Sequence, residues 1–166
     1  MKYNITFVPT NFVIANMKIE EIIKSNSALP LAKKTLLNLI YTQTCASEKF
    51  NEVLKVYDVS VEQFNVLRIL KGQKGNPVNM SDIQERMIAK TSNTTRLVDK
   101  LLLKELCTRK VCPENRRKIE VLITEKGIQL LEKINPEVEE FENKWTENLN
   151  TRELEELNIL LEKLRS

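Results

Sequence analysis

A short polar stretch, TSNTTR at residues 91–96, carries side chains that can hydrogen-bond to the edges of nucleic-acid bases. Asn93 can pair with adenine, a threonine methyl can meet the methyl of thymine, and Arg96 can read guanine or hold a phosphate. The stretch has a second interpretation as a strong helix cap, because Ser, Thr and Asn also satisfy the free N–H groups at the start of a helix.

A second group of such residues follows in CPENRR at residues 112–117, where Arg116 stands 20 positions after Arg96. An arginine at the tip of a turn suits the narrow, electronegative minor groove of DNA, although a solvated charged turn has the same composition. Residues 78–127 hold eleven Lys+Arg against seven Asp+Glu, a balance of +4. The candidate phosphate contacts in this basic block are Lys90, Lys100, Lys104, Arg109, Lys110 and Lys118.

The composition argues against most enzyme chemistry. The chain has no His, which removes catalytic Ser-His and Cys-His pairs and His-based zinc sites. Its three Gly cannot build a phosphate-binding Gly-rich loop. We therefore expect no enzyme, no cofactor and no metal. The three Cys are too few and too irregularly spaced for a disulfide framework, which favours reduced thiols and a cytoplasmic protein.

The elements that must position the two polar stretches can be read from periodicity and capping signals. Leucines and aromatics at helical spacing predict a long helix over 31–57. Ser60 followed by Gln63 is a capping box that opens a second helix, which Gly72 and Gly75 end. Asn79 caps a short helix that buries Ile83 and Met87, and the polar stretch then opens the next helix. Buried positions of that helix are predicted to be Leu97, Val98, Leu101 and Leu102.

The period then changes to that of a strand, with Ile119, Val121 and Ile123 alternating with other residues, and residues 107–111 as the hairpin partner. Thr124 is predicted to cap a further helix that Pro136 interrupts, and Thr151 to open a final helix. The predicted fold class is mainly α with a small β-hairpin wing, a winged helix-turn-helix with long N- and C-terminal dimerisation helices. No run of 18 apolar residues exists, so we expect no membrane span.

Residues 78–127 resemble the DNA-binding lobe of the MarR family of bacterial transcription regulators. The most specific segments are TRLVDKL at 95–101 and NRRKIEVLITEKG at 115–127, and a weaker similarity in pattern extends over residues 31–166. The resemblance implies a domain over 31–166, with a DNA-binding lobe at 58–127, a helix-turn-helix at about 79–103 and a wing at about 107–123. It also implies dimerisation helices at 31–57 and 128–166.

The resemblance further implies a homodimer that binds double-stranded DNA at a pseudo-palindromic operator, more as a repressor than as an activator. It places Ser92 to Arg96 in the major groove and makes Arg117 the wing arginine. The expected DNA contacts are Lys90, Thr91, Ser92, Asn93, Thr94, Thr95, Arg96, Lys100, Asn115, Arg116 and Arg117. The rival interpretation is a winged-helix dimer that acts as a protein-interaction module without operator binding.

Three positions depart from the family's usual pattern. Asn115 stands where Asp usually partners the wing arginine, Ile88 lies in the turn where Gly is frequent, and Glu105 stands where Gly commonly ends the recognition helix. If Glu105 adopts the left-handed conformation it is strained, so we expect Glu105→Gly to raise the melting temperature.

The flanking helices carry apolar stripes that a two-fold dimer would bury, although an intramolecular bundle would also bury them. Members of the family commonly bind small aromatic or anionic effectors in the crevice between the helical and winged parts. The residues that could line it here are Tyr41, Cys45, Phe50 and Tyr57, although helical spacing makes them core residues more often than ligands. Cys45 and Cys112 are candidate redox sensors, a hypothesis that equal DNA affinity before and after mild peroxide treatment would remove.

The first 30 residues are predicted to form an N-terminal extension. The segment 1–16 precedes Met17 and the helical sequence MKIEEIIK, and one hypothesis takes Met17 as the natural start. The other takes the segment as an N-terminal arm, and mass spectrometry of the protein from its native host would decide between them.

Overall fold

The computed structural model describes residues 17–112 and 115–166, and the side chains of residues 112 and 115–118 lie outside that description. The hypotheses about residues 1–16 therefore concern residues beyond it. Two compact units are present, the first ending at Ser47 and the second beginning at Glu48. The elements are α1 (Ile19–Ile22), α2 (Leu31–Lys55), α3 (Val61–Gly72), β1 (Val78–Asn79), α4 (Met80–Arg86), α5 (Thr94–Leu103), β2 (Cys107–Cys112), β3 (Asn115–Ile123), α6 (Glu125–Thr146) and α7 (Thr151–Leu164).

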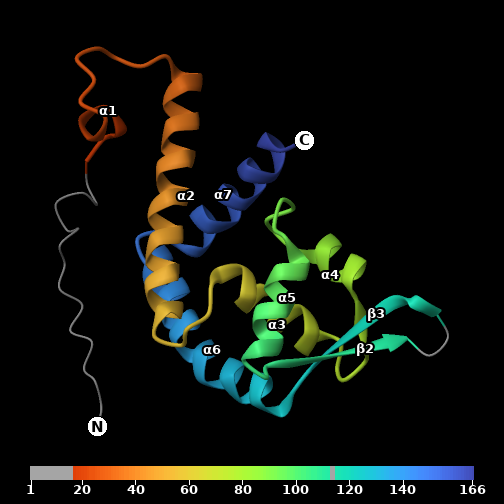
Figure 1. The fold of residues 1–166 in the computed structure, drawn as a ribbon. Helices are drawn as coiled ribbons and strands as arrows, with labels where there is room; N and C mark the ends of the chain where they lie inside the picture. Colours follow the sequence, from red (N-terminus) through yellow and green to blue (C-terminus); the bar gives the residue numbers. More distant parts are fainter. Residues whose placement is uncertain (1–16, 113–114) are drawn as a thin grey trace, which may run out of the picture. The chain divides into compact units, whose positions relative to one another are not determined.

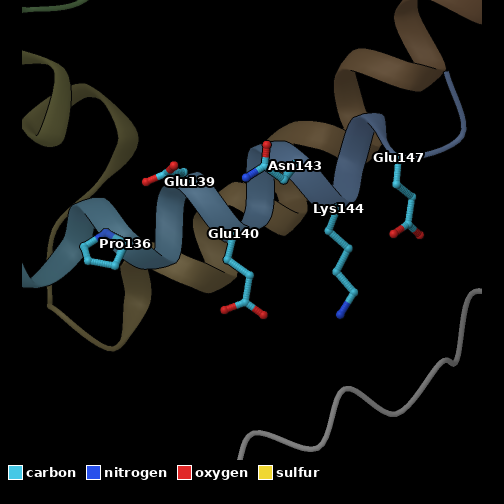
Figure 2. A pocket seen from close by; sticks show the side chains of 6 residues that line it. All are labelled: Pro136, Glu139, Glu140, Asn143, Lys144 and Glu147. Atoms are coloured by element: carbon cyan, nitrogen blue, oxygen red, sulfur yellow. The ribbon is translucent and has the colours of Figure 1, made fainter. Parts of the chain in front are cut away.

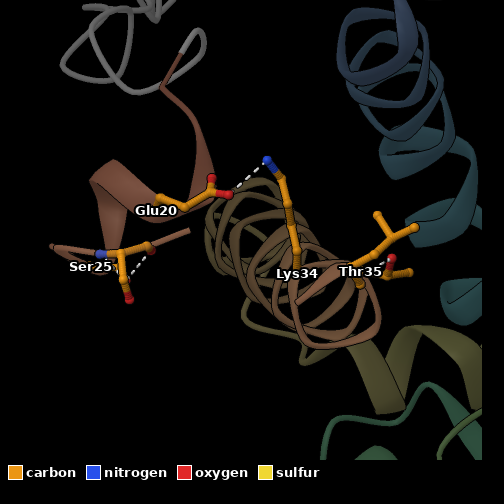
Figure 3. Close-up of polar contacts among 6 residues, drawn as sticks. Glu20, Ser25, Lys34 and Thr35 are labelled. Atoms are coloured by element: carbon orange, nitrogen blue, oxygen red, sulfur yellow. Dashed lines mark hydrogen bonds and ion pairs between the residues drawn. The ribbon is translucent and has the colours of Figure 1, made fainter. Parts of the chain in front are cut away.

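The first unit contains α1 and most of α2. An ion pair joins the two helices, with Lys34 Nζ 2.8 Å from Glu20 Oε1, and Figure 3 shows this contact. The hydrogen bond from Lys34 lowers the pKa of Glu20. Thr35 donates its hydroxyl to the carbonyl of Leu31 one turn earlier in α2, at 3.0 Å.

In the second unit, local caps start the helices where the sequence predicts. Ser60 Oγ accepts from the Gln63 N–H at 3.2 Å while the Gln63 side chain accepts from the Ser60 N–H at 3.0 Å, so the capping box is complete. Asn79 Oδ1 accepts from the Asp82 N–H at 2.9 Å at the start of α4. Because each cap joins residues three apart, the residue types alone fix these helix starts.

The core of the second unit lies where α3, α4, α5, the sheet and the first half of α6 meet. Fully buried side chains from these elements include Phe64, Leu67, Ile83, Leu101, Val121 and Leu131. Val98 and Leu101 of α5 are buried as expected, while Leu97 and Leu102 are half-buried. This core holds α5 in place behind the polar stretch that begins it.

A three-stranded antiparallel sheet in the order β1-β3-β2 completes this unit. The predicted β2-β3 hairpin is confirmed, with Arg109 opposite Val121 and Cys107 opposite Ile123, and it projects from the helices as the teal arrows in Figure 1. The two-residue strand β1 was not expected. It pairs Val78 with Val121, and its formation buries Val78.

The prediction that Pro136 interrupts the helix is wrong, because α6 runs continuously from Glu125 to Thr146. A proline inside a helix loses its own N–H bond and clashes with the preceding turn, at a cost of about 3 kcal/mol. Pro136 faces solvent, while Ile134 and Val138 on either side of it are 0% and 3% exposed. Burial of these neighbours offsets the cost and keeps the two halves in one helix.

The last helix, α7, begins at Thr151 as predicted, with a complete capping box between Asn150 and Glu153. Several of its apolar side chains are exposed, with Leu157 at 43% and Leu164 at 51%, and no residue of α7 is buried. Trp145 at the end of α6 is also exposed. Large apolar side chains in this number on one segment are normally covered by another surface.

Candidate nucleic-acid interface

The turn between α4 and α5 is braced by hydrogen bonds that set the angle of α5. The Gln84 side chain donates to the Lys90 carbonyl at 2.7 Å, and the Ser92 N–H donates to the Ala89 carbonyl at 3.0 Å. Lys90 Nζ in turn donates to the Glu85 carbonyl at the end of α4. These contacts give the α4–turn–α5 segment the arrangement of a helix-turn-helix, in which the start of the second helix faces outward.

Asn93 is the N-cap of α5, and its Oδ1 accepts from the Arg96 N–H at 3.1 Å. The capping interpretation of the polar stretch is therefore confirmed. It does not displace the DNA interpretation, because most of the neighbouring side chains remain exposed. The exposed members of the predicted set are Lys90, Thr91, Asn93, Thr95, Arg96 and Lys100, and Ser92 is half-buried.

Thr94 is placed differently from the rest of the predicted set. It is only 5% exposed, and its hydroxyl donates to the side-chain oxygen of Gln84 on α4. The helical turn that points Thr95 and Arg96 outward points Thr94 inward, since successive residues are rotated by about 100°. Thr94 thus fastens the start of α5 to α4, and we do not include it among the base contacts proposed below.

The wing begins directly after α5 and is attached to it. Arg109 Nη1 on β2 lies 2.9 Å from Asp99 Oδ1 on α5, which ties the strand to the middle of the helix. Arg109 is one of the predicted phosphate contacts, and its guanidinium group is engaged in this ion pair. The predicted wing contacts Asn115, Arg116 and Arg117 belong to β3, but their side chains lie outside the described part of the structure.

The end of α5 is closed by Glu105, whose φ of 60° lies in the left-handed region. Its carbonyl accepts from the Thr124 hydroxyl at 2.8 Å, and its carboxylate pairs with Lys126 at 2.8 Å. The hydrogen bond from Lys126 lowers the pKa of Glu105. The strained residue therefore joins the end of α5 to the start of α6.

An ion pair that no local sequence pattern predicts lies beside Glu105. Lys104 Nζ is 2.8 Å from Asp58 Oδ2 and also donates to the main-chain carbonyl of Asp58. The two residues are 46 positions apart, and nothing in their local sequence marks them as partners. This contact ties the end of α5 to the turn between α2 and α3.

Two of the four predicted effector-pocket residues, Phe50 and Tyr57, lie in the second unit and are engaged in packing. Phe50 stacks on Phe141 at a ring distance of 5.4 Å and meets Phe64 edge-on at 5.8 Å. The Tyr57 hydroxyl donates to Glu137 at 2.6 Å, and burial together with this bond raises the pKa of Tyr57 to about 12.

The other two, Tyr41 and Cys45, are half-buried and belong to the first unit. Cys107, by contrast, is buried in the second unit, and burial raises its pKa to about 11, which keeps this thiol protonated at neutral pH.

Two surface hollows of the second unit lie along α6. The one in Figure 2 is lined only by residues from the outer side of this helix and its end, Pro136, Glu139, Glu140, Asn143, Lys144 and Glu147. Another is bounded by the end of α3, including Arg68 and Lys71, and by α6. Neither contains a residue of the predicted effector pocket.

Within the described ranges, no three His, Cys, Asp or Glu side chains gather as a metal site would require, and no helix there has both the length and the apolarity to cross a bilayer.

The α4–turn–α5 segment, followed by an antiparallel hairpin, defines a winged helix-turn-helix. The MarR family model matches residues 59–119, which run from the start of α3 into β3. A solved structure of a mutant of the Escherichia coli MarR protein in complex with operator DNA has the same fold, with a TM-score of 0.71 and 24% identity over 83% of this chain and 99% of that chain.

Two relatives from Bacillus subtilis extend the match in sequence. The chain is 31% identical over 131 residues to the HTH-type transcriptional regulator YpoP, covering 79% of this chain and 89% of YpoP. It is 33% identical over 91 residues to the HTH-type transcriptional regulator MhqR, covering 55% of this chain and 61% of MhqR. The chain belongs to the MarR family of transcriptional regulators.

Proposed function

We propose that this transcriptional regulator is a cytoplasmic, homodimeric repressor without enzymatic activity. Each protomer would insert the start of α5 into the major groove of one half-site of a pseudo-palindromic operator, and a small aromatic or anionic effector would release the dimer. The contacts proposed at the major groove come from Ser92, Asn93, Thr95 and Arg96, with Lys90, Thr91 and Lys100 nearby for phosphates.

The observation that carries this proposal is the exposure of most of these side chains at the start of a helix that other elements hold from behind. Base recognition requires side chains held close to one geometry, so the helix that carries them must not tilt. Here Thr94 fastens its start to α4, Asp99 its middle to the wing and Lys104 its end to Asp58. The outward side chains keep polar groups of the kinds that read base edges.

Dimerisation is supported by the apolar side chains that one chain leaves uncovered. Those of α7 and the end of α6 include Trp145, Leu157, Leu160 and Leu164. A second copy related by a two-fold axis would cover them and would present two recognition helices to successive half-sites.

Repression and effector release are supported by relatives. IacR of Pseudomonas putida and MprA of Escherichia coli are named as transcriptional repressors. The solved structure of BpsR from Bordetella bronchiseptica describes regulation of its DNA binding by 6-hydroxynicotinic acid. The four predicted pocket residues are not shown to form one site, so the effector site itself stays a prediction.

The test is selection of bound fragments from genomic DNA, followed by measurement of affinity against salt for the selected duplex. We expect log K to fall with log salt with a slope of about 0.9 per neutralised phosphate. Arg96→Ala should weaken binding, and Arg165→Ala, which removes the same charge from the C-terminal end of the chain, should not. No enrichment of any fragment, or equal effects of the two variants, would contradict the proposal.

A further inference from the structure

Lys104 has the charge and the position in sequence of a DNA phosphate contact, but its ammonium group is already engaged. It lies 2.8 Å from the carboxylate of Asp58 and donates to the carbonyl of the same residue. Lys100, one turn earlier on α5, is exposed and makes no ion pair with any residue whose side chain the structure describes. Lys100 on α5 and Lys104 at its C-cap therefore differ, because only the ammonium group of Lys104 has a carboxylate partner.

The partner of Lys104 belongs to a turn that is itself anchored. Asp58 follows α2 with a φ of 54°, and its N–H donates to the Lys55 carbonyl at 3.1 Å. The preceding residue, Tyr57, donates its hydroxyl to Glu137 on α6 at 2.6 Å. Two consecutive residues thus connect α6 on one side with the end of α5 on the other.

We propose that Lys104 is a positioning residue for DNA recognition, which holds the end of α5 through the Tyr57–Asp58 turn to α6, and that it is not a phosphate contact. The inference rests on the proposed function, because it assigns a role in DNA binding. It adds a residue outside the polar stretch to those on which affinity depends.

The length of α5 shows why this end matters. Its ten residues span about 15 Å, so a tilt of about 4° at the end of the helix moves its start by about 1 Å. Functional side chains must be held within about 0.5 Å of their working positions. Loosening the Lys104–Asp58 contact therefore costs affinity even though the residues that touch bases are unchanged.

The decisive variant is Asp58→Asn, measured on the selected duplex together with Lys104→Gln and the double variant. Asn tolerates the left-handed conformation, so the turn is kept. Removing a negative charge would strengthen DNA binding if only electrostatics mattered, whereas positioning predicts that Asp58→Asn weakens it by about two- to fivefold. Lys104→Gln should weaken it equally, and the double variant no further than either single one.

Lys100→Gln is the matched control, because it removes the same charge from the same helix. It should lower the salt slope by about 1.8, because each bound dimer loses two phosphate contacts, whereas Lys104→Gln should leave the slope unchanged. Faster amide hydrogen exchange at the end of α5 in Lys104→Gln, but not in Lys100→Gln, would support the role without reference to DNA.

Tighter binding by Asp58→Asn, or a lower salt slope for Lys104→Gln, would overturn the assignment. A wild-type chain that binds no duplex would instead overturn the proposed function and the inference with it. The two failures are therefore distinguishable in one set of titrations.

Discussion

Replacing Gly127 by Ala tests how closely the start of α6 approaches the end of α5. A Cβ at Gly127 would stand 2.3 Å from the carbonyl oxygen of Leu106 and 2.8 Å from Cγ1 of Ile123. The Leu106 carbonyl is not free to move, because it accepts from the Thr124 N–H at 3.1 Å. Thr124 in turn caps α6 through the Gly127 N–H at 3.1 Å. The added methyl group would therefore clash with the Leu106 carbonyl, which is hydrogen-bonded to the N-cap of α6.

The expected free-energy change can be worked from these contacts. Overpacking of this kind costs about 1–3 kcal/mol, and loss of the Thr124–Leu106 hydrogen bond costs about 1 kcal/mol more. Replacing Gly by Ala inside a helix returns about 1 kcal/mol. The net loss in the free energy of unfolding is about 1–3 kcal/mol, which for a chain of this size lowers the melting temperature by roughly 3–10 °C.

Gly72→Ala is the matched control, because Gly72 is the last residue of α3 and a Cβ there would meet nothing within 4 Å. It should stabilise the protein by about 0.5 kcal/mol. Both variants should be unfolded with urea at the same protein concentration and followed by circular dichroism, since a dimer's stability depends on concentration. A Gly127→Ala protein as stable as the wild type would refute the close approach.

Two further substitutions probe the end of α5 and the Tyr57 contact. Glu105→Gly should raise the melting temperature by about 2–4 °C in calorimetry. The substitution relieves the left-handed strain at this residue, and that gain exceeds the loss of its exposed, salt-screened ion pair with Lys126. An unchanged or lower melting temperature would contradict this prediction. The pKa of Tyr57 is raised to about 12 from its ordinary value of 10.0, so the folded state holds the proton more tightly than the unfolded state. Its contribution to stability is therefore complete below pH 10 and is lost as the pH rises towards about 12. Tyr57→Phe should lack that loss, and phenolate absorbance should show that the group missing from this variant titrates near pH 12. A missing group that titrates near pH 10 would exclude the contact with Glu137.

The parts of the fold that the sequence predicted are those fixed by residues close together in the chain. The caps at Ser60, Asn79 and Thr124 each join positions three apart, and the alternation around Val121 is the property of a single strand. Residue type and spacing determine such features before any tertiary contact forms. The left-handed Glu105 was predictable for a similar reason, since it stands at the end of a helix where a glycine is expected.

The features that escaped prediction depend on contacts between distant segments. The sequence placed Thr94 with its exposed neighbours, but the direction of a side chain depends on which face of α5 meets α4. The pair of Lys104 with Asp58 spans 46 positions, and any exposed lysine has the same local appearance. Pro136 looked like a helix break because its cost is local, whereas the burial of Ile134 and Val138 that offsets it is tertiary.

The central claim, that the start of α5 reads DNA sequence, is tested most directly by Asn93→Ser. Ser is as good an N-cap as Asn, so the helix is kept while the amide that can read a base is lost. The measurement is the ratio of affinities for the selected duplex and for a scrambled duplex of the same length and composition. We expect a ratio of at least about 1,000 for the wild type and a fall of about fivefold or more in the variant, with an unchanged melting temperature. A wild-type ratio near one, or an unchanged ratio in the variant, would contradict the account.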